Sequence, residues 1–139
     1  MNNKEIHIIV AEDEAINRLY LSTILKKTGY VVDQASNGQE VLDLWQKKRY
    51  HLILMDINMP VLDGIETAKR IRAQERKQFK NSDMTGLPPR IPIIPITAHA
   101  FSEEKIKCEE AGMDTFITKP VEEHKLFTAI RQFIPHMEK

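Results

Sequence analysis

The sequence IHIIVA occupies residues 6–11 and runs directly into two acids, Glu12 and Asp13. A run with so few polar side chains is typical of a strand that is buried on both faces, as in a parallel sheet covered by helices. The run LILM at residues 52–55 has the same character and also ends at an acid, Asp56. These two segments therefore predict a parallel sheet whose strands end in carboxylates.

Further strand-like runs follow at residues 30–35, 91–96 and 115–118, separated by segments of helical pattern. In those segments apolar residues recur at three- and four-residue spacing, which predicts one buried face per helix. The apolar positions are Ile16, Leu19, Tyr20 and Ile24, then Val41, Leu42 and Trp45, then Ile65, Ala68 and Ile71, and finally Leu126, Phe127, Ile130 and Ile134. Strands that alternate with helices through right-handed crossovers predict a doubly wound α/β domain with five strands.

Turn and capping residues support these boundaries. Asp63 fits a capping box at the start of the third helix, and the second helix could begin at either Ser36 or Asn37. Gly29 and Gly112 stand where a left-handed residue would end the first and the fourth helix. The expected elements are therefore bounded by residues suited to begin or end them.

Two features do not fit this scheme. The polar segment 76–90 is longer than the usual connection of ~2–6 residues, and we expect it to be an exposed insertion. Pro95 lies inside a strand-like run, although proline removes a ladder hydrogen-bond donor. Either that strand is irregular there, or Pro95 lies where no ladder bond is made.

Composition limits the possible functions. A chain of 139 residues suits a single domain over residues 1–139, and its 20 basic side chains balance 20 acidic ones, so no net charge favours nucleic acid or an anionic membrane. The single Cys108 excludes an intramolecular disulfide and suits a reducing compartment. No apolar stretch approaches the ~20 residues of a membrane span. We therefore expect a cytoplasmic domain without nucleic-acid or membrane contact of its own.

Side chains of complementary chemistry stand at the carboxyl ends of the apolar runs: Glu12, Asp13, Asp56, Thr97 and Lys119. In an open α/β sheet such ends share one crevice, and neighbouring strands lie ~4.8 Å apart. Clustered carboxylates repel one another unless a positive charge intervenes, and Mg²⁺ prefers carboxylate, water and phosphate oxygens. The set predicts a site for a divalent cation, Mg²⁺ or Mn²⁺, and a phosphoryl group. The alternative is a set of solvated or helix-capping acids.

Four motifs resemble the receiver domain of response regulators in two-component signalling. They are AEDE at residues 11–14, LMDINMPVLDG at 54–64, ITA at 96–98 and TKP at 118–120. The resemblance covers nearly the whole chain apart from the segment 76–90. It implies the flavodoxin-like strand order 2-1-3-4-5, with helices on both faces of the sheet.

The resemblance also implies a role for each residue at the strand ends. Asp56 would be the phosphoacceptor, a nucleophile that takes a phosphoryl group from a phosphohistidine. The metal ligands would be Glu12, Asp13, Asp56 and the backbone carbonyl of Asn58. Lys119 and Thr97 would contact phosphoryl oxygens. The peptide bond between Lys119 and Pro120 would be cis.

Two further roles follow from the family pattern. Phe116 would rotate inward when Thr97 moves toward a new phosphoryl group, which makes these two residues a candidate switch; alternatively, Phe116 is an ordinary core residue. Asn58 and His99 flank the acceptor, where they would tune the rate at which the acyl phosphate is lost. The alternative for His99 is a solvent-facing loop residue.

Other details resemble receivers attached to hybrid sensor histidine kinases, namely Asn17 and the runs AHA at 98–100 and AGMD at 111–114. The resemblance implies a sensor histidine kinase or a histidine phosphotransfer protein as partner. Ile16 and Tyr20 would be docking contacts, unless they belong to the core. The chain would then be a stand-alone receiver or a part of a hybrid histidine kinase.

Three other functions compete with this interpretation. An aspartyl-phosphate hydrolase would normally have a second carboxylate two residues after the nucleophile, where this chain has Asn58. An interaction-only domain would not need the complete site. A flavin-binding protein would need a phosphate-cradling loop after the first strand, where acids stand instead. We therefore expect no separate turnover enzyme, but a domain that catalyses its own phosphorylation and dephosphorylation.

Overall fold

A computed structural model describes residues 5–81, 90–98 and 102–134 of the chain. In these residues one parallel sheet has the strand order β2-β1-β3-β4-β5. The strands are β1 (His7–Ala11), β2 (Val31–Ala35), β3 (Leu52–Asp56), β4 (Ile93–Thr97) and β5 (Ile117–Thr118). This order confirms the predicted flavodoxin-like fold and makes β1 and β3 direct neighbours.

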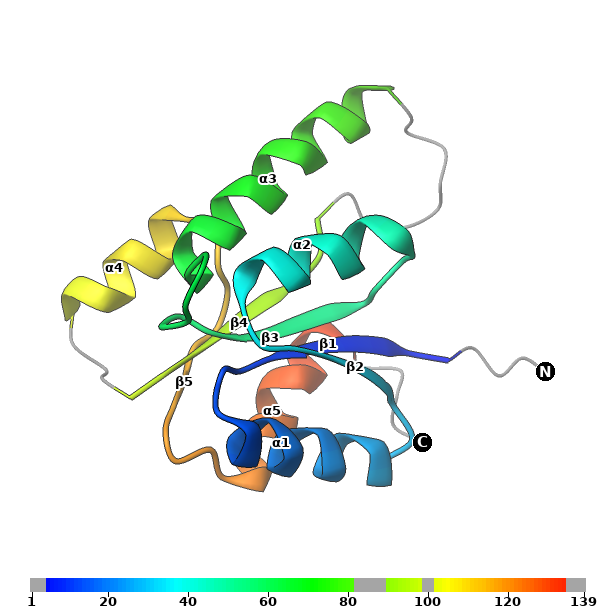
Figure 1. Ribbon diagram of the computed structural model, residues 1–139, viewed down its shortest axis with the longest axis vertical. Helices are drawn as coiled ribbons and strands as arrows, with labels where there is room; N and C mark the ends of the chain where they lie inside the picture. The colour runs from blue at the N-terminus through cyan, green and yellow to red at the C-terminus, as the bar shows by residue number, and fades with distance from the viewer. Residues whose placement is uncertain (1–4, 82–89, 99–101, 135–139) are drawn as a thin grey trace.

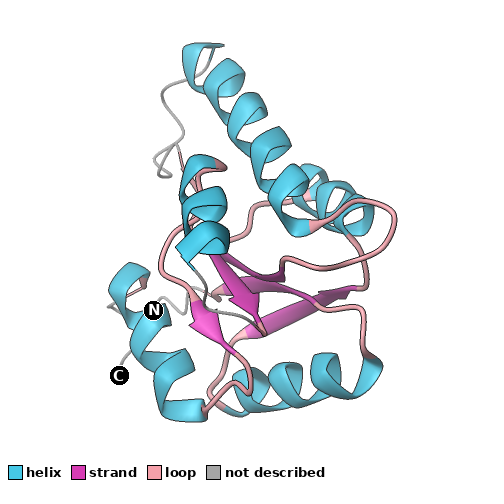
Figure 2. Cartoon of the chain, turned by 90° about the vertical axis from the view of Figure 1, so that its left-hand side faces the viewer, coloured by secondary structure: helices cyan, strands magenta, loops and turns pink. Residues whose placement is uncertain are grey.

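Helices cover both faces of the sheet (Figure 1). They are α1 (Ala15–Lys27), α2 (Gly38–Lys47), α3 (Gly64–Asn81), α4 (Ser102–Glu110) and α5 (Glu123–Phe133). α1 and α5 lie on one face, and α2, α3 and α4 lie on the other. Figure 2 shows the same layers after a quarter turn, with the sheet between the two groups of helices.

The two apolar cores explain why the strand sequences contain so few polar residues. In β1, Ile8 and Val10 pack on the side of α1 and α5, whereas Ile9 and Ala11 pack on the side of α2, α3 and α4. Each of these side chains is completely buried. Since successive strand residues point to opposite faces, a sheet covered twice requires an apolar residue at every position.

The predicted buried face of α1 is wrong in part. Ile16, Leu19 and Tyr20 are 81%, 62% and 44% exposed, whereas Ile24 and Leu25 are buried. No residue between 15 and 20 is buried, so within the described part of the chain the first half of α1 adds no residue to either apolar core. The apolar spacing continues through both halves of the helix, and spacing alone cannot show where the packing surface ends.

The structure resolves the alternative caps of α2. The side chain of Asn37 accepts a hydrogen bond from the amide of Glu40 at 2.9 Å, and the Glu40 carboxylate in turn accepts one from the amide of Ser36 at 2.7 Å. The helix therefore begins after Asn37, and Ser36, one residue before the cap, bonds to the Glu40 side chain. Gly29 and Gly112 have φ of 107° and 88°, which confirms the predicted left-handed helix ends.

Pro95 lies within β4, in register with Met55 of β3. The amides of Ile53 and Ile57 donate to the carbonyls of residues 92 and 96, so the even-numbered residues of β4 bond to β3. The nitrogen of Pro95 therefore faces β5, where pairing begins only at Ile96 with Ile117. The second alternative is correct, because Pro95 lies where no ladder bond is made.

The segment 76–90 is partly helical. α3 continues to Asn81, and the next residues lie outside the described part of the chain until Arg90. Arg90 donates to Asp114 at 2.8 Å and to the carbonyl of Gly112 at 3.0 Å. The end of the segment is thus attached to the connection between α4 and β5, while its role as an exposed insertion stays a prediction.

A buried ionic network joins α3 to the same connection. Arg72 donates to Glu75 at 2.7 Å, to the Gly112 carbonyl at 2.9 Å and to Asp114 at 3.4 Å. The other oxygen of Glu75 accepts from the amide of Ile91 at 2.7 Å. Arg72 and Glu75 are buried, so each charge depends on the partners around it. The network fixes the end of α4 and the approach to β4 against α3.

We expect Arg72→Met to lower the free energy of unfolding by about 3 kcal/mol, because Glu75 and Asp114 would lose a buried cation. Arg70 on the same helix is a matched control: it pairs with Glu66 at 3.3 Å, but its side chain is 53% exposed. Arg70→Met should therefore cost less than about 1 kcal/mol. Urea unfolding measures both changes, and equal losses would contradict the stabilising role of the network.

Candidate functional site

The acids that end β1 and β3 meet at one lysine. Lys119 Nζ lies 2.9 Å from Asp56 Oδ2 and 3.4 Å from Glu12 Oε1. Asp56 and Glu12 are only 3% and 1% exposed, although both carry a carboxyl group. The adjacent strands β1 and β3 bring the two acids together, and the end of β5 supplies the ammonium. The structure thus assembles three of the predicted site residues in one buried cluster.

Asp13 completes a set of oxygens suited to a divalent cation. One oxygen each from Glu12, Asp13 and Asp56 lies within 4.8 Å of the other two, and Asp13 is exposed to solvent. Glu12 Oε1 is buried but makes no hydrogen bond. A hard cation satisfies such an oxygen and neutralises clustered carboxylates. The donor set therefore fits Mg²⁺ or Mn²⁺.

The environment changes the protonation of the cluster. Burial and the neighbouring charge of Asp56 raise the pKa of Glu12 to about 7. Burial alone would lower the pKa of Lys119, but its hydrogen bond and charge interaction with Asp56, together with the charge of Glu12, raise it. Lys119 therefore stays an ammonium, and without a second cation one carboxyl of the cluster tends to retain its proton.

Thr97 ends β4 and is completely buried. Its hydroxyl donates to Glu104 Oε1 of α4 at 2.8 Å, and its carbonyl accepts from the amide of Lys119 at 2.8 Å. The peptide bond between Lys119 and Pro120 is cis, as the family resemblance implied. β4 and β5 therefore hold Thr97 and Lys119 at the same end of the sheet as Asp56.

The loop after Asp56 is held tightly to the site. The amide of Asn58 donates to Asp56 Oδ1 at 3.0 Å, while the Asn58 side chain is exposed. Gly64 approaches so closely that a Cβ there would lie 2.5 Å from the Asp56 carbonyl oxygen. Between them Val61 adopts φ 68°, and the amide of Leu62 donates to the carbonyl of Pro60 at 2.7 Å. This tight turn brings the chain back to the end of β3.

Exposed apolar residues stand close in sequence to the acids. Ile16 follows Asp13 by three residues and is 81% exposed, and Val61 in the loop after Asp56 is 78% exposed. The hydroxyl of Tyr20 donates to the carbonyl of Val121 at 3.1 Å, which links α1 to the segment after Lys119. Ile16 and Tyr20 are therefore not core residues, and their docking role stays a prediction.

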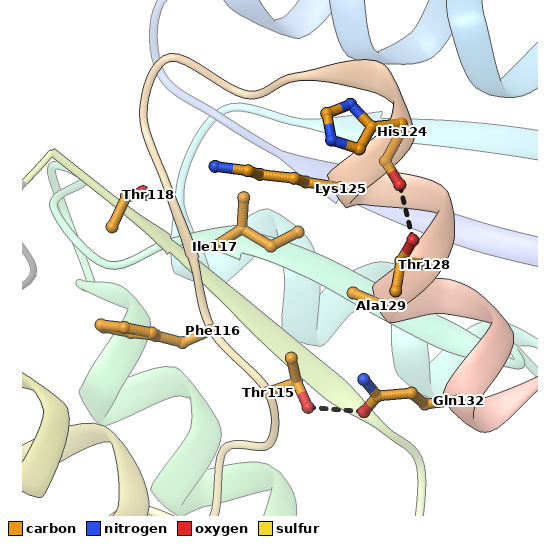
Figure 3. Close-up of a pocket in the computed structure, with 9 residues that line it drawn as sticks. All are labelled: Thr115, Phe116, Ile117, Thr118, His124, Lys125, Thr128, Ala129 and Gln132. Carbon is orange, nitrogen blue, oxygen red and sulfur yellow. Dashed lines mark hydrogen bonds between the residues drawn. The ribbon is translucent and has the colours of Figure 1, made fainter.

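Phe116 lies outside both apolar cores and is half-buried. It borders a hollow of about 530 Å³ between the β5 segment and α5, where Thr115 donates to Gln132 at 2.8 Å (Figure 3). Lys105 Nζ of α4 lies 5.8 Å from the centre of the Phe116 ring. The switch role of Phe116 stays a prediction, and His99 lies outside the described residues.

Two contacts of the site were not expected from the sequence. Glu104 accepts the Thr97 hydrogen bond, a contact between two side chains that only the packing of α4 against the end of β4 brings together. Arg18 of α1 donates to the backbone carbonyl of Glu12 at 2.8 Å. No sequence signal identified Arg18, because its partner is a main-chain atom that only the fold brings near.

Comparison with known proteins identifies the family. Residues 8–131 match the sequence profile of the response regulator receiver domain. Hybrid signal transduction histidine kinase K of Dictyostelium discoideum is 36% identical over 134 residues, which cover 96% of this chain and 11% of the kinase. The chain belongs to the response regulator receiver domain family, and it is a receiver domain of two-component signalling.

Solved structures agree with this assignment. The yeast complex of the histidine phosphotransfer protein Ypd1 with the receiver domain of Ssk1 matches with a TM-score of 0.84 and 36% identity, covering 93% of this chain and 88% of that one. The receiver domain of sensor histidine kinase PA1611 from Pseudomonas aeruginosa, described with magnesium in its active-site cleft, matches with a TM-score of 0.80 and 30% identity, covering 95% and 99%.

None of the helices in the described ranges combines the length and the apolar character that crossing a bilayer requires. The cytoplasmic location expected from the sequence stays a prediction.

We expect Glu12→Gln to change how stability depends on pH in metal-free protein. The folded protein retains the Glu12 proton up to about pH 7, whereas the unfolded chain releases it near 4.5. The native state binds more protons in this interval, so the free energy of unfolding falls as the pH rises through it. Glu12→Gln removes this loss, and its stability relative to wild type should grow by on the order of 2 kcal/mol from pH 4.5 to pH 8.

Urea unfolding in EDTA across this pH range measures the effect. The exposed Glu110 offers a control, since Glu110→Gln should leave the pH dependence unchanged. Parallel curves for wild type and Glu12→Gln would show that Glu12 titrates normally.

Proposed function

We propose that Asp56 is the phosphoacceptor of this receiver domain and takes its phosphoryl group from a phosphohistidine. The observation that carries the proposal is the buried Asp56 carboxylate, held by Lys119 at 2.9 Å within reach of Glu12 and Asp13. This arrangement presents one carboxylate to a donor while a fixed ammonium and two further acids surround it.

The proposed reaction is a displacement at phosphorus. An oxygen of Asp56 attacks the phosphorus, a P–O bond forms, and the P–N bond to the donor imidazole breaks. The electron pair of that bond remains on the imidazole nitrogen, which can take a proton from solvent, and the product is an acyl phosphate. Lys119 and Thr97 interact with phosphoryl oxygens, so the residues position the group and balance its charge.

We further propose that Mg²⁺, or Mn²⁺ in its place, is the cofactor of this reaction. Its ligands would be the carboxylates of Glu12, Asp13 and Asp56 and the backbone carbonyl of Asn58. When bound, the ion supplies positive charge against which the phosphoryl oxygens are neutralised. The buried Glu12 oxygen without a hydrogen bond supports this assignment.

Asn58 and His99 are proposed to set the lifetime of the acyl phosphate. The Asn58 side chain is exposed two residues after Asp56. An amide cannot act as a general base in the way that a carboxylate at this position could. We propose that the domain catalyses its own phosphorylation and dephosphorylation and is not a separate turnover enzyme.

A protein that carries the phosphohistidine is the proposed partner, either a sensor histidine kinase or a histidine phosphotransfer protein. The exposed apolar side chains of Ile16 and Tyr20 provide a docking surface on α1 close to Asp13. Large apolar side chains that remain exposed beside a reactive site are suited to a protein partner. The yeast Ypd1–Ssk1 receiver complex offers a precedent in a related domain.

The proposed output is a change at the β4–α4–β5 side of the site. Thr97 would move toward the phosphoryl group on Asp56, and Phe116 would then change its position between α4 and α5. Phe116 is half-buried and borders a hollow, so it has room to rotate. The phosphoryl group adds about −1.5 to −2 charges, a local change that can bias two arrangements of this surface.

We expect acetyl phosphate with Mg²⁺ to add one phosphoryl group to the chain, as measured by intact-mass spectrometry. Asp56→Ala should abolish the adduct because it removes the attacking oxygen. Asp63→Asn is a matched control in the same loop and should still form the adduct. The Asp63 carboxylate accepts a hydrogen bond from the amide of Glu66 at 2.8 Å and thereby caps α3. An adduct that persists in Asp56→Ala would refute the assignment of the acceptor.

Docking of the partner protein and the phosphoryl-transfer reaction can be tested separately. We expect Ile16→Asp to slow transfer from a phosphorylated histidine phosphotransfer protein by at least about tenfold, the equivalent of one apolar anchor. Its reaction with acetyl phosphate should be unchanged, since a small donor needs no docking surface. Ile106→Asp on α4 is the control, because Ile106 is also exposed, at 51%. Equal slowing by both variants, or no slowing by Ile16→Asp, would contradict docking through α1.

A further inference from the structure

The hydrogen bond between Thr97 and Glu104 connects the end of β4 to the first turn of α4. Thr97 is completely buried, and its hydroxyl lies 2.8 Å from Glu104 Oε1. Glu104 is half-buried, whereas its neighbours Glu103 and Lys105 are exposed. Glu104 is therefore turned toward the site while the residues around it face solvent.

This bond and the proposed phosphoryl contact exclude each other. A threonine hydroxyl has one hydrogen to donate, while the Glu104 carboxylate and the phosphoryl oxygens can only accept. Thr97 donates to Glu104 in the unmodified domain. To donate to a phosphoryl group on Asp56, Thr97 has to break its hydrogen bond to Glu104.

The two ends of α4 are held by different kinds of contact. Near the first turn Glu104 bonds to Thr97, whereas beyond the last turn the Gly112 carbonyl accepts from Arg72 at 2.9 Å and from Arg90 at 3.0 Å. The guanidinium contacts belong to the network at α3 and have no group in common with the phosphorylation site. Loss of the Thr97 bond therefore removes one contact near the start of α4 and leaves the contacts beyond its last turn in place.

We propose that Glu104 is a positioning residue that holds the Thr97 hydroxyl in the unmodified domain and yields it when Asp56 is phosphorylated. The inference rests on the proposed function of Asp56. In this role Glu104 disfavours phosphorylation, because its hydrogen bond to Thr97 has to break before Thr97 can donate to the phosphoryl group. It also assigns the first turn of α4 as the part of that helix that responds.

The test uses beryllofluoride with Mg²⁺ as a phosphoryl mimic and measures its affinity for the 139-residue chain by isothermal titration calorimetry. We expect Glu104→Ala to bind the mimic about tenfold more tightly than wild type, the equivalent of one hydrogen bond to a charged group. Glu103→Gln, an exposed neighbour, should leave the affinity at the wild-type value.

Glu104→Gln separates the hydrogen bond from the charge. Its amide oxygen still accepts from Thr97 but forms a weaker bond, so we expect an affinity between those of wild type and Glu104→Ala. In a Thr97→Ala background the Glu104→Ala substitution should have no further effect, because the hydroxyl is already absent. A general loosening of α4 would raise the affinity in both backgrounds.

Each outcome decides the role of Glu104. Equal affinities of wild type and Glu104→Ala would overturn the inference while leaving the acceptor role of Asp56 intact. Identical values for Glu104→Gln and Glu104→Ala would assign the effect to charge and overturn the hydrogen-bond role. A wild-type chain that fails to bind beryllofluoride would instead refute the proposed function, and the inference with it.

Discussion

Two buried carboxyl groups and one ammonium constrain the end of the sheet where β1, β3 and β5 finish. Glu12 and Asp56 are almost inaccessible to water, yet they lie close enough to share Lys119. Buried like charges are stable only with a compensating cation, and removal of that cation is costly. The sheet order provides the compensation, since β1 and β3 are adjacent and the strand at the edge returns Lys119 to the same end. The strand order of the fold therefore determines where the charged side chains of the site lie.

Much of this arrangement was accessible from sequence because local patterns determine it. Apolar runs that end in acids place Asp56 and Glu12 at the carboxyl ends of strands, and a parallel sheet collects such ends at one edge. The sequence could not show how far along α1 the buried face extends, since Ile16 and Leu19 have the same spacing as the residues that are buried. Amphipathic spacing indicates a helix, but how much of that helix is buried depends on tertiary packing.

Other features depend on contacts between distant segments. Pro95 is compatible with β4 because pairing with β5 begins one residue later, which no local pattern reveals. The bond from Thr97 to Glu104 depends on how α4 lies against the end of β4, and the carbonyl bonded by Arg18 has no side-chain signature at all. The clustering of Glu12, Asp13, Asp56 and Lys119 at one end of the sheet was thus predictable, whereas the hydrogen bonds around them were not.

The turn at Val61 has a consequence for the backbone around Asp56. Its positive φ, the short bond from Leu62 to Pro60 and the contact of Gly64 with the Asp56 backbone fix the β3–α3 connection to the sheet. A side chain at Gly38 would overlap with Thr67 and with the Leu62 carbonyl, so the start of α2 abuts this connection as well. The β3–α3 connection and the start of α2 are thus packed too closely at Gly38 and Gly64 to accept a side chain at either position. A side chain at Gly64 would therefore displace the backbone that carries Asp56.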